Sequence, residues 1–270
     1  MKAVLTYHSI DDSGSPISTA TAAYRSHVAW FESRRVRVLP LDDLIAHPDG
    51  DGDAVALVFD DAFLDVRDPV ERLLGAGLAA TVFVVSGHVG GTNDWGGRSQ
   101  PGIPALPLLG WDDLARLAAR GATIGAHTRT HPCLTTLDGR WLEEEILGCC
   151  DDIQARIGVR ATHFAYPYGA VDARVAGCAG RHYRFGHTTA FGALRASDAP
   201  TRLPRLDAYY FQSPGALESF GTRAFSLRVA ALRARRRLRS GLIGGWAPAH
   251  APAGGGKRPS GSIATAERSK

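Results

Sequence analysis

Two adjacent aspartates, Asp60 and Asp61, are the residues of this chain best placed to do chemistry. They follow the apolar run Leu57-Val58-Phe59, whose β-branched and aromatic members predict a strand buried on both faces. In parallel α/β folds, the edge formed by the carboxyl ends of the strands carries the active site. Two bare carboxylates this close would raise the pKa of one of them, whereas a divalent cation on one would leave the other free as a base. The alternative is that Asp61 caps the next helix and Asp60 is a solvated turn residue.

Two histidines follow a second predicted strand in the same way. His127 and His131 come after the apolar segment Ala122-Thr123-Ile124, and residues four apart meet on one face of a helical turn. Neutral imidazole suits zinc and similar divalent ions. Two histidines and one aspartate would leave coordination positions open, as a catalytic metal requires and a structural zinc does not. The sequence therefore indicates a catalytic site for a divalent metal.

A third segment, Tyr166-Pro167-Tyr168-Gly169, completes a pattern that resembles the polysaccharide deacetylases. These proteins share the NodB homology domain and form carbohydrate esterase family four. The first motif of the family is similar to Phe59-Asp60-Asp61, and the second is similar to His127-Thr128-Arg129-Thr130-His131. The segment Tyr7-His8-Ser9-Ile10 resembles the opening of the exopolysaccharide-type branch. The resemblance covers roughly residues 1 to 210, and three motifs in the right order are specific.

The resemblance implies a metal-dependent hydrolase that removes N-acetyl groups from the sugars of a polysaccharide or glycolipid precursor. By that resemblance Asp61, His127 and His131 would hold the metal, with zinc expected and cobalt or nickel as alternatives. Asp60 would be the general base, and a backbone N–H near Tyr168 would stabilise the oxyanion. Two other functions stay open. The chain could remove formyl or cleave another amide on a lipid-linked sugar, or it could be a catalytically weakened relative that binds a glycan or a partner protein.

The sequence departs from the family pattern at two points. The third motif of many members carries an arginine that orients the base, and Phe164-Ala165-Tyr166 has none. Arg205 could reach the base from another strand, or it could pair with Asp207 at the surface. The late Leu-x-His motif that supplies the general acid is also absent. His8 is the first substitute and His187 the second, although either could be a hydrogen-bonded structural histidine.

Apolar segments and helical patterns alternate along the chain, which predicts a βα repeat with a parallel sheet. The resemblance implies the same α/β class, as an irregular (β/α) barrel of the NodB type with about seven parallel strands over residues 1–215. Segment 86–110 is rich in Gly and Pro and long for a loop, which indicates a functional one. Trp95 in this loop could form a wall for sugar stacking or pack against the loop itself. Strands are expected at 3–7, 36–39, 57–59, 79–85, 122–124, 164–165, 185–189 and 203–206, and helices at 20–34, 41–44, 68–74, 111–119, 138–157 and 171–179.

Positive charge is concentrated at the end of the chain. Residues 222–270 hold eleven Lys and Arg against one acid, a net +10, and since the whole chain carries +4, residues 1–221 carry −6. Residues 216–243 predict a basic amphipathic helix, and residues 244–270 are expected to be disordered. The helix could pack on the barrel with a solvated arginine face, contact an anionic membrane, or bind nucleic acid. No nucleic-acid partner is expected, because no recognition motif accompanies the charge.

The four cysteines, Cys133, Cys149, Cys150 and Cys178, form neither a C-x-x-C pair nor a disulfide framework. Cys149 and Cys150 are expected to pack as small hydrophobic side chains on a helix. The first apolar run is too short for a signal peptide or a membrane span. These features favour a cytoplasmic location, with membrane association through the basic segment as an addition.

Overall fold

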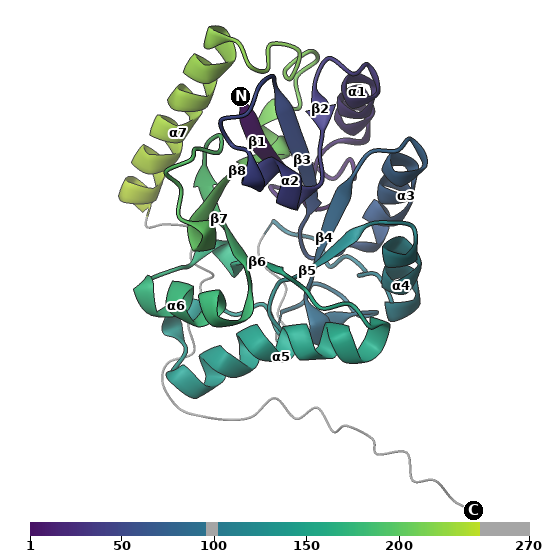
Figure 1. The fold of residues 1–270 in the computed structure, drawn as a ribbon, viewed down its shortest axis with the longest axis vertical. Coiled ribbons are helices and arrows are strands. Elements are labelled where there is room, and N and C mark those ends of the chain that lie inside the picture. Colours follow the sequence, from purple (N-terminus) through teal and green to yellow (C-terminus); the bar gives the residue numbers. More distant parts are fainter. Residues whose placement is uncertain (96–101, 244–270) are drawn as a thin grey trace, which may run out of the picture.

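A closed barrel of seven parallel strands forms the centre of the protein (Figure 1). The computed structural model describes residues 1–95 and 102–243. The barrel closes because β1 pairs in parallel with both β3 and β8, and the short strand β2 pairs with β3 outside it. The predicted fold class is therefore confirmed. The strands are β1 (Lys2–Tyr7), β2 (Arg37–Val38), β3 (Ala54–Phe59), β4 (Ala80–Val84), β5 (Thr123–Ala126), β6 (His163–Ala165), β7 (Phe185–Phe191) and β8 (Leu203–Asp207).

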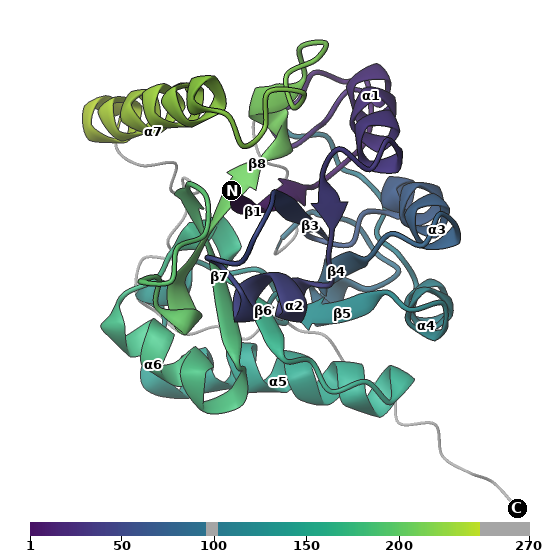
Figure 2. The same cartoon turned by 45° about the horizontal axis from the view of Figure 1, so that its top comes forward.

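Helices surround the barrel, and most of them connect one barrel strand to the next (Figures 1 and 2). They are α1 (Thr21–Glu32), α2 (Leu41–Ala46), α3 (Arg67–Gly75), α4 (Trp111–Ala119), α5 (Gly139–Ile157), α6 (Ala173–His182) and α7 (Arg223–Ile243). Short 3-10 turns lie at η1 (Leu64–Val66), η2 (Ser86–His88), η3 (Leu134–Thr136), η4 (Pro167–Gly169), η5 (Pro200–Arg202) and η6 (Ala208–Phe211). No helix in the described part of the chain combines the length and the apolarity that a membrane-crossing span needs.

Alternation along the strands divides the apolar side chains into two cores. Side chains such as Val58 and Phe83 fill the inside of the barrel, and Leu44 of α2 packs against this inner set. Leu57 and Val82 point outward and pack under the surrounding helices. The inner core is tight where β5 passes Phe83, since a Cβ on Gly125 would lie 2.5 Å from the phenyl ring. Glycine at this position therefore leaves room for the aromatic ring inside the barrel.

The long helix α5 is close to its prediction. Asp138 is the N-cap, because its side chain accepts a hydrogen bond from the backbone N–H of Trp141. Gly158 ends the helix with a φ of 72°. Cys149 and Cys150 on this helix are fully buried and pack in the outer core, as expected.

The basic helix begins later than the sequence indicates. Residues 216–222 form turns, and the helix starts at Arg223. Gly215 and Gly221 adopt positive φ values of 69° and 83°, which break a helical path through this segment. Leu217 and Phe220 are nevertheless buried, with the ring of Phe220 5.6 Å from that of Trp30. The expectation for residues 244–270 lies outside the described residues.

Candidate active site

The carboxylate of Asp61 and the imidazoles of His127 and His131 converge at the carboxyl ends of β3 and β5. Asp61 Oδ1 lies 3.4 Å from His127 Nε2 and 3.3 Å from His131 Nε2. One ligand atom from each of the three side chains falls within 4.8 Å of the others, and all three residues are buried. The structure therefore brings together the three residues predicted to hold a metal.

The prediction that His127 and His131 lie on one helical turn is wrong. Residues 127–131 form a bend, in which Thr128 and His131 adopt positive φ values of 68° and 59°. The hydroxyl of Thr128 accepts a hydrogen bond from the backbone N–H of His131, which holds the bend closed. The imidazole centroids lie 4.9 Å apart. The bend therefore brings the two rings together, as the helical turn was expected to do.

The donor set fits a divalent cation. His127 Nδ1 lies 2.7 Å from the carbonyl oxygen of Ala165, which can only accept, so Nδ1 carries the proton in the neutral ring. Nε2 of His127 then offers a lone pair toward Asp61 Oδ1. That oxygen is buried and has no hydrogen-bond partner among the described residues. Lone pairs that converge on an unsatisfied buried carboxylate oxygen are stabilised by a shared cation.

Asp60 faces a different set of side chains. Its Oδ1 accepts a hydrogen bond of 2.8 Å from Nη1 of Arg205 on β8, and its Oδ2 lies 3.7 Å from Nε2 of His8. The Arg205 side chain is 4% exposed, and its Nε donates to the carbonyl of Thr188. Arg205 thus reaches Asp60 from another strand, and the alternative of a surface pair with Asp207 is wrong. The alternative reading of Asp60 as a solvated turn residue is also wrong.

The two carboxylates are both held ionised, in contrast to a bare pair. Burial alone would raise the pKa of Asp60, but Arg205, His127 and His8 outweigh it and hold that pKa below its ordinary value. Burial is likewise outweighed at Asp61, whose pKa is lowered by His131 and His127. Burial wins at His131 and lowers its pKa to about 3, which keeps the imidazole neutral as a metal ligand requires.

Aromatic side chains fix the orientation of His131. The hydroxyl of Tyr168 is 3.0 Å from His131 Nδ1, and the ring of Trp95 stacks on the imidazole with centroids 4.5 Å apart. Trp95 also meets His88 edge to face. The contact with His88 agrees with the expectation that Trp95 packs against its own loop, whereas the stacking on His131 was not expected. Tyr168 itself adopts a φ of 60°, and the turn η4 places it beside the histidines.

Helix α5 supports the histidine bend through two acidic residues that the sequence analysis missed. Glu145 accepts hydrogen bonds from the backbone N–H groups of Arg129 and Thr130 and from the Thr130 hydroxyl. Asp152 accepts two hydrogen bonds from the guanidinium of Arg129. The sequence does contain a signal for these two acids, because both lie next to the apolar positions of the helix and not at the centre of its polar face.

Comparison with known proteins identifies the family. The sequence model of the polysaccharide deacetylase family matches residues 47–183, which include all three motifs. The chain belongs to the polysaccharide deacetylase family. As a polysaccharide deacetylase it is a hydrolase that acts on the carbon–nitrogen bonds of N-acetylated sugars. Comparison with curated protein sequences gave no match.

Solved structures share the fold. The Streptococcus pyogenes deacetylase PplD is 19% identical, with a TM-score of 0.64 over 76% of this chain and 91% of that chain. IcaB from Ammonifex degensii is 22% identical, with a TM-score of 0.65 over 76% of this chain and 90% of that chain. A de-N-acetylase from Aggregatibacter actinomycetemcomitans is 20% identical, with a TM-score of 0.58 over 77% and 95%.

The two substitutes for the missing general acid of this deacetylase lie in different surroundings. His8 is at the rim, with its side chain 25% exposed and close to Asp60. His187 is fully buried inside the barrel, where Nε2 lies 3.1 Å from His163 Nδ1 and the ring contacts Phe83. The position of His187 therefore suits a structural histidine, and His8 is the one that a substrate could reach.

A second group of metal-capable side chains joins α5 to α6. Glu143, Cys178 and His182 have donor atoms within 4.8 Å of one another. The same carboxylate oxygen that accepts from Cys178 also accepts from Arg181, so a guanidinium already occupies this side of Glu143. His182 Nε2 lies 2.6 Å from the other oxygen. These contacts satisfy Glu143 without a cation, and we assign no metal here.

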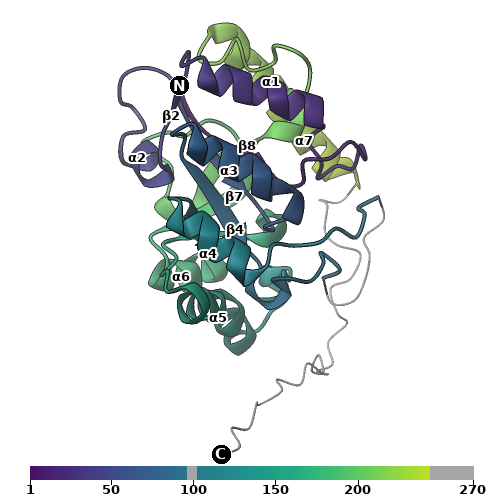
Figure 3. The same cartoon turned by 90° about the vertical axis from the view of Figure 1, so that its right-hand side faces the viewer.

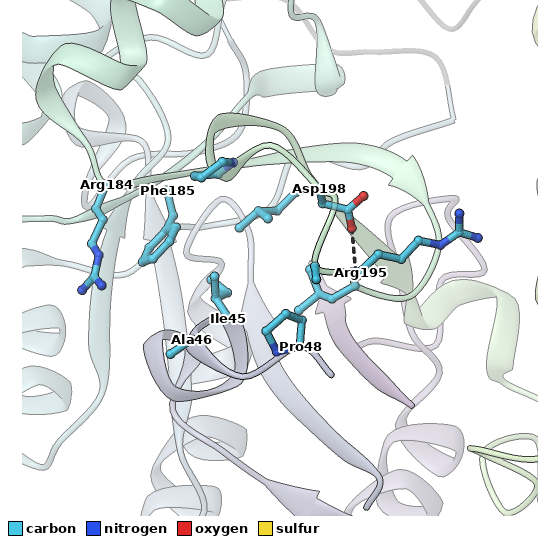
Figure 4. Close-up of a pocket in the computed structure, with 11 residues that line it drawn as sticks. Ile45, Ala46, Pro48, Arg184, Phe185, Arg195 and Asp198 are labelled. Carbon is cyan, nitrogen blue, oxygen red and sulfur yellow. Dashed lines mark hydrogen bonds between the residues drawn. The ribbon is translucent and has the colours of Figure 1, made fainter. Parts of the chain in front are cut away.

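A cavity of about 410 Å³ lies at the opposite end of the barrel from the catalytic rim (Figure 4). Its lining includes Phe185 and Leu203, which begin β7 and β8, and Ile45 of α2. Arg184 and Arg195 lie on opposite sides of it and point outward in Figure 4. The cavity is separate from the converging histidines and aspartates, so we assign the chemistry to the rim.

Replacing Asp61 with Asn is expected to remove metal binding while leaving the fold intact. The amide keeps the shape of the side chain but lacks the charge that faces the two Nε2 atoms, so affinity for zinc should fall by more than about 100-fold. Competition titration with a chromophoric chelator measures this affinity. Asp60→Asn is the matched control and should retain the metal, because Asp60 is bonded to Arg205. Equal losses in both variants would contradict the assignment of Asp61 as the ligand.

Replacing Glu145 with Ala tests the support that α5 gives to the bend. The variant leaves two backbone N–H groups and one hydroxyl without their acceptor, so the histidines lose their fixed geometry. Zinc affinity should fall about 10- to 100-fold, as for other groups that orient metal ligands. The neighbouring Glu144→Ala is the control, since Glu144 makes only a 3.7 Å ion pair with Arg129. The role proposed for Glu145 is wrong if both variants bind zinc as the unmodified chain does.

Proposed function

We propose that this deacetylase is a metal-dependent enzyme that removes acetyl groups from N-acetylhexosamine units of a polysaccharide or glycolipid precursor. The main support for the proposal is that two adjacent buried carboxylates have different partners and can therefore take different roles. Asp61 directs an unsatisfied oxygen at two imidazoles, and Asp60 is bonded to Arg205 instead. In such a pair one carboxylate can bind a metal ion while the other stays free to accept a proton from water, and metal-assisted hydrolysis of an amide uses both roles.

The residues of the rim have distinct proposed roles. Asp61, His127 and His131 would hold a divalent ion, with zinc as the expected one. When bound, such an ion supplies Lewis acidity that polarises an acetyl carbonyl and lowers the pKa of water. Asp60 accepts the proton of the attacking water, and Arg205 keeps the carboxylate ionised and oriented. The backbone N–H of Tyr168 stabilises the oxyanion.

His8 is the proposed general acid. Its Nε2 lies 3.7 Å from Asp60 Oδ2, so a proton taken up by the carboxylate is close to the imidazole. Its partial exposure leaves the ring accessible to the amine that leaves the sugar. A histidine at this edge can therefore complete the proton transfer that amide cleavage needs, without the late histidine motif.

Free thiols support a proposed cytoplasmic location. All four cysteines are unpaired, and Cys149, Cys150 and Cys178 are buried. Thiols of this kind are typical of a reducing compartment. The basic helix α7 beside the rim favours a substrate on the inner, anionic surface of a membrane.

Acetate release from N-acetylglucosamine oligomers tests the proposed function. The zinc- or cobalt-loaded protein should release acetate, and Asp60→Asn should lower kcat by at least about 100-fold while the metal stays bound. The exposed Asp112→Asn is a control that should leave the rate unchanged. Formate should be measured from N-formyl substrates in parallel. Formate release without acetate release would favour a deformylase, and no turnover of any amide would favour a glycan-binding relative.

Arg205→Gln is expected to move the acidic limb of the pH profile of kcat/KM to higher pH. The base works as a carboxylate, and Arg205 lowers its pKa against the effect of burial. Removing the guanidinium therefore raises the pKa of Asp60, and the limb should shift upward by about one to two pH units. Rates measured from pH 4 to pH 9 give the limb. The exposed Arg202→Gln serves as the control, and a limb that stays in place in Arg205→Gln would argue against Asp60 as the base.

A further inference from the structure

The outer face of α7 is apolar and exposed. Among the residues whose side chains are described (1–95 and 102–238), the large hydrophobic side chains with the greatest exposure are Leu238 at 67% and Leu227 at 63%, and both belong to this helix. They are eleven residues apart, which is three turns, so they lie on one face. Ala231 and Ala234 lie between them on the same face and are also exposed. These four residues are called the outer stripe below.

The opposite face of α7 fixes the orientation of the helix. Phe225 and Val229 are buried against the protein. The guanidinium of Arg236 lies over the rings of Phe191 and Tyr210, at 5.3 and 5.2 Å from their centroids. Arg228 lies over Phe211 in the same way. Because one face is held by these contacts, the outer stripe points away from the barrel. Figure 2 shows α7 on the outside of the barrel.

Arginines flank the outer stripe. Helix α7 contains seven arginines and no acidic residue, while residues 1–221 carry a net −6. At 100° per residue, Arg233 and Arg235 fall on opposite sides of the line that joins Leu227 and Leu238. An apolar stripe between two rows of cations matches the boundary between acyl chains and anionic headgroups.

The carboxyl-terminal half of α7 lies beside the catalytic rim (Figure 3). Arg236 donates a hydrogen bond to the carbonyl of Thr189, at the end of β7. The hydroxyl of Thr189 in turn donates to the carbonyl of Tyr168. Two contacts therefore connect the helix to the turn that carries Tyr168.

We propose that α7 docks this protein on an anionic membrane surface, with the outer stripe in the headgroup region and the catalytic rim facing a glycan displayed there. The docking itself is independent of the chemistry, and the placement of the glycan rests on the proposed function. Nucleic acid would be held by the arginines alone and would gain nothing from two exposed leucines. A second copy of the helix would bring two arginine rows together, and their repulsion opposes that contact.

Sedimentation with vesicles tests the docking. The full chain should bind vesicles that contain phosphatidylglycerol in phosphatidylcholine, and should bind pure phosphatidylcholine at least about tenfold more weakly. Leu227→Gln/Leu238→Gln should lower binding about tenfold or more. The matched control is Trp141→Gln, which removes an exposed apolar side chain from α5 and should leave binding unchanged.

A second pair of variants separates the helix from the rest of the basic segment. Arg233→Gln/Arg235→Gln should weaken binding about thirtyfold, whereas Lys257→Gln/Arg258→Gln removes the same charge elsewhere and should weaken it less than about threefold. The docking role of α7 is overturned if both charge variants lose the same affinity, or if neutral vesicles bind as well as anionic ones. Tighter binding of duplex DNA than of anionic vesicles at equal salt would also overturn it.

Activity separates docking from chemistry. On a soluble N-acetylglucosamine oligomer, Leu227→Gln/Leu238→Gln should keep the kcat/KM of the unmodified chain. On the same sugar anchored to anionic vesicles through a lipid, kcat/KM should fall about tenfold. An equal fall on both substrates would overturn the placement of the rim at the membrane. If the unmodified chain binds vesicles but deacetylates neither substrate, the proposed function fails and the docking stands.

Discussion

The site depends on burying two adjacent carboxylates and giving each its own set of partners. Asp60 and Asp61 are 2% and 6% exposed, and like charges this close disfavour joint ionisation. In a regular strand, neighbouring side chains point to opposite faces, so Asp61 would turn away from the barrel axis. Its φ of 65° redirects the chain, and both carboxylates then face the rim. Arg205 satisfies one, and two imidazoles surround the other.

This arrangement exists only when the barrel is closed. Asp60 and Arg205 are 145 positions apart, and the pairing of β1 with both β3 and β8 brings them together. His127 depends on a third contact, because the carbonyl of Ala165 on β6 fixes its tautomer. The groups around the two carboxylates thus come from several strands: Arg205 from β8, His8 from the end of β1, and both His127 and His131 from the end of β5. The parallel barrel supplies a common edge for them, and no local segment could assemble the set alone.

The sequence predicted which residues would meet at this edge better than it predicted how they would meet. Alternating strands and helices, together with the three motifs, were sufficient for the barrel and for the Asp61, His127 and His131 group. The bend at Thr128 could not be read from the pattern, because a β-branched residue is a poor indicator of positive φ. The pairing of Arg205 with Asp60 could not be predicted with certainty either, because it depends on the register of β8 against β1, which is set by the tertiary structure. The start of α7 was missed because apolar residues that pack in turns, such as Leu217 and Phe220, mimic helical spacing.

Unusual backbone angles are concentrated around the candidate site. Among the described residues, positive φ at a residue other than glycine occurs at Arg34, at four positions in the three motifs (Asp61, Thr128, His131 and Tyr168) and at Ala62, directly after the first motif. Each such position costs about 1 to 3 kcal/mol and persists only where its surroundings hold it. Glu145 and Asp152 supply that support around Thr128, and Gly148 leaves room for the guanidinium that Asp152 binds, since a Cβ there would lie 2.7 Å from it. The strain lies close to the residues proposed as metal ligands and base, and α5 stabilises the bend that carries His127 and His131.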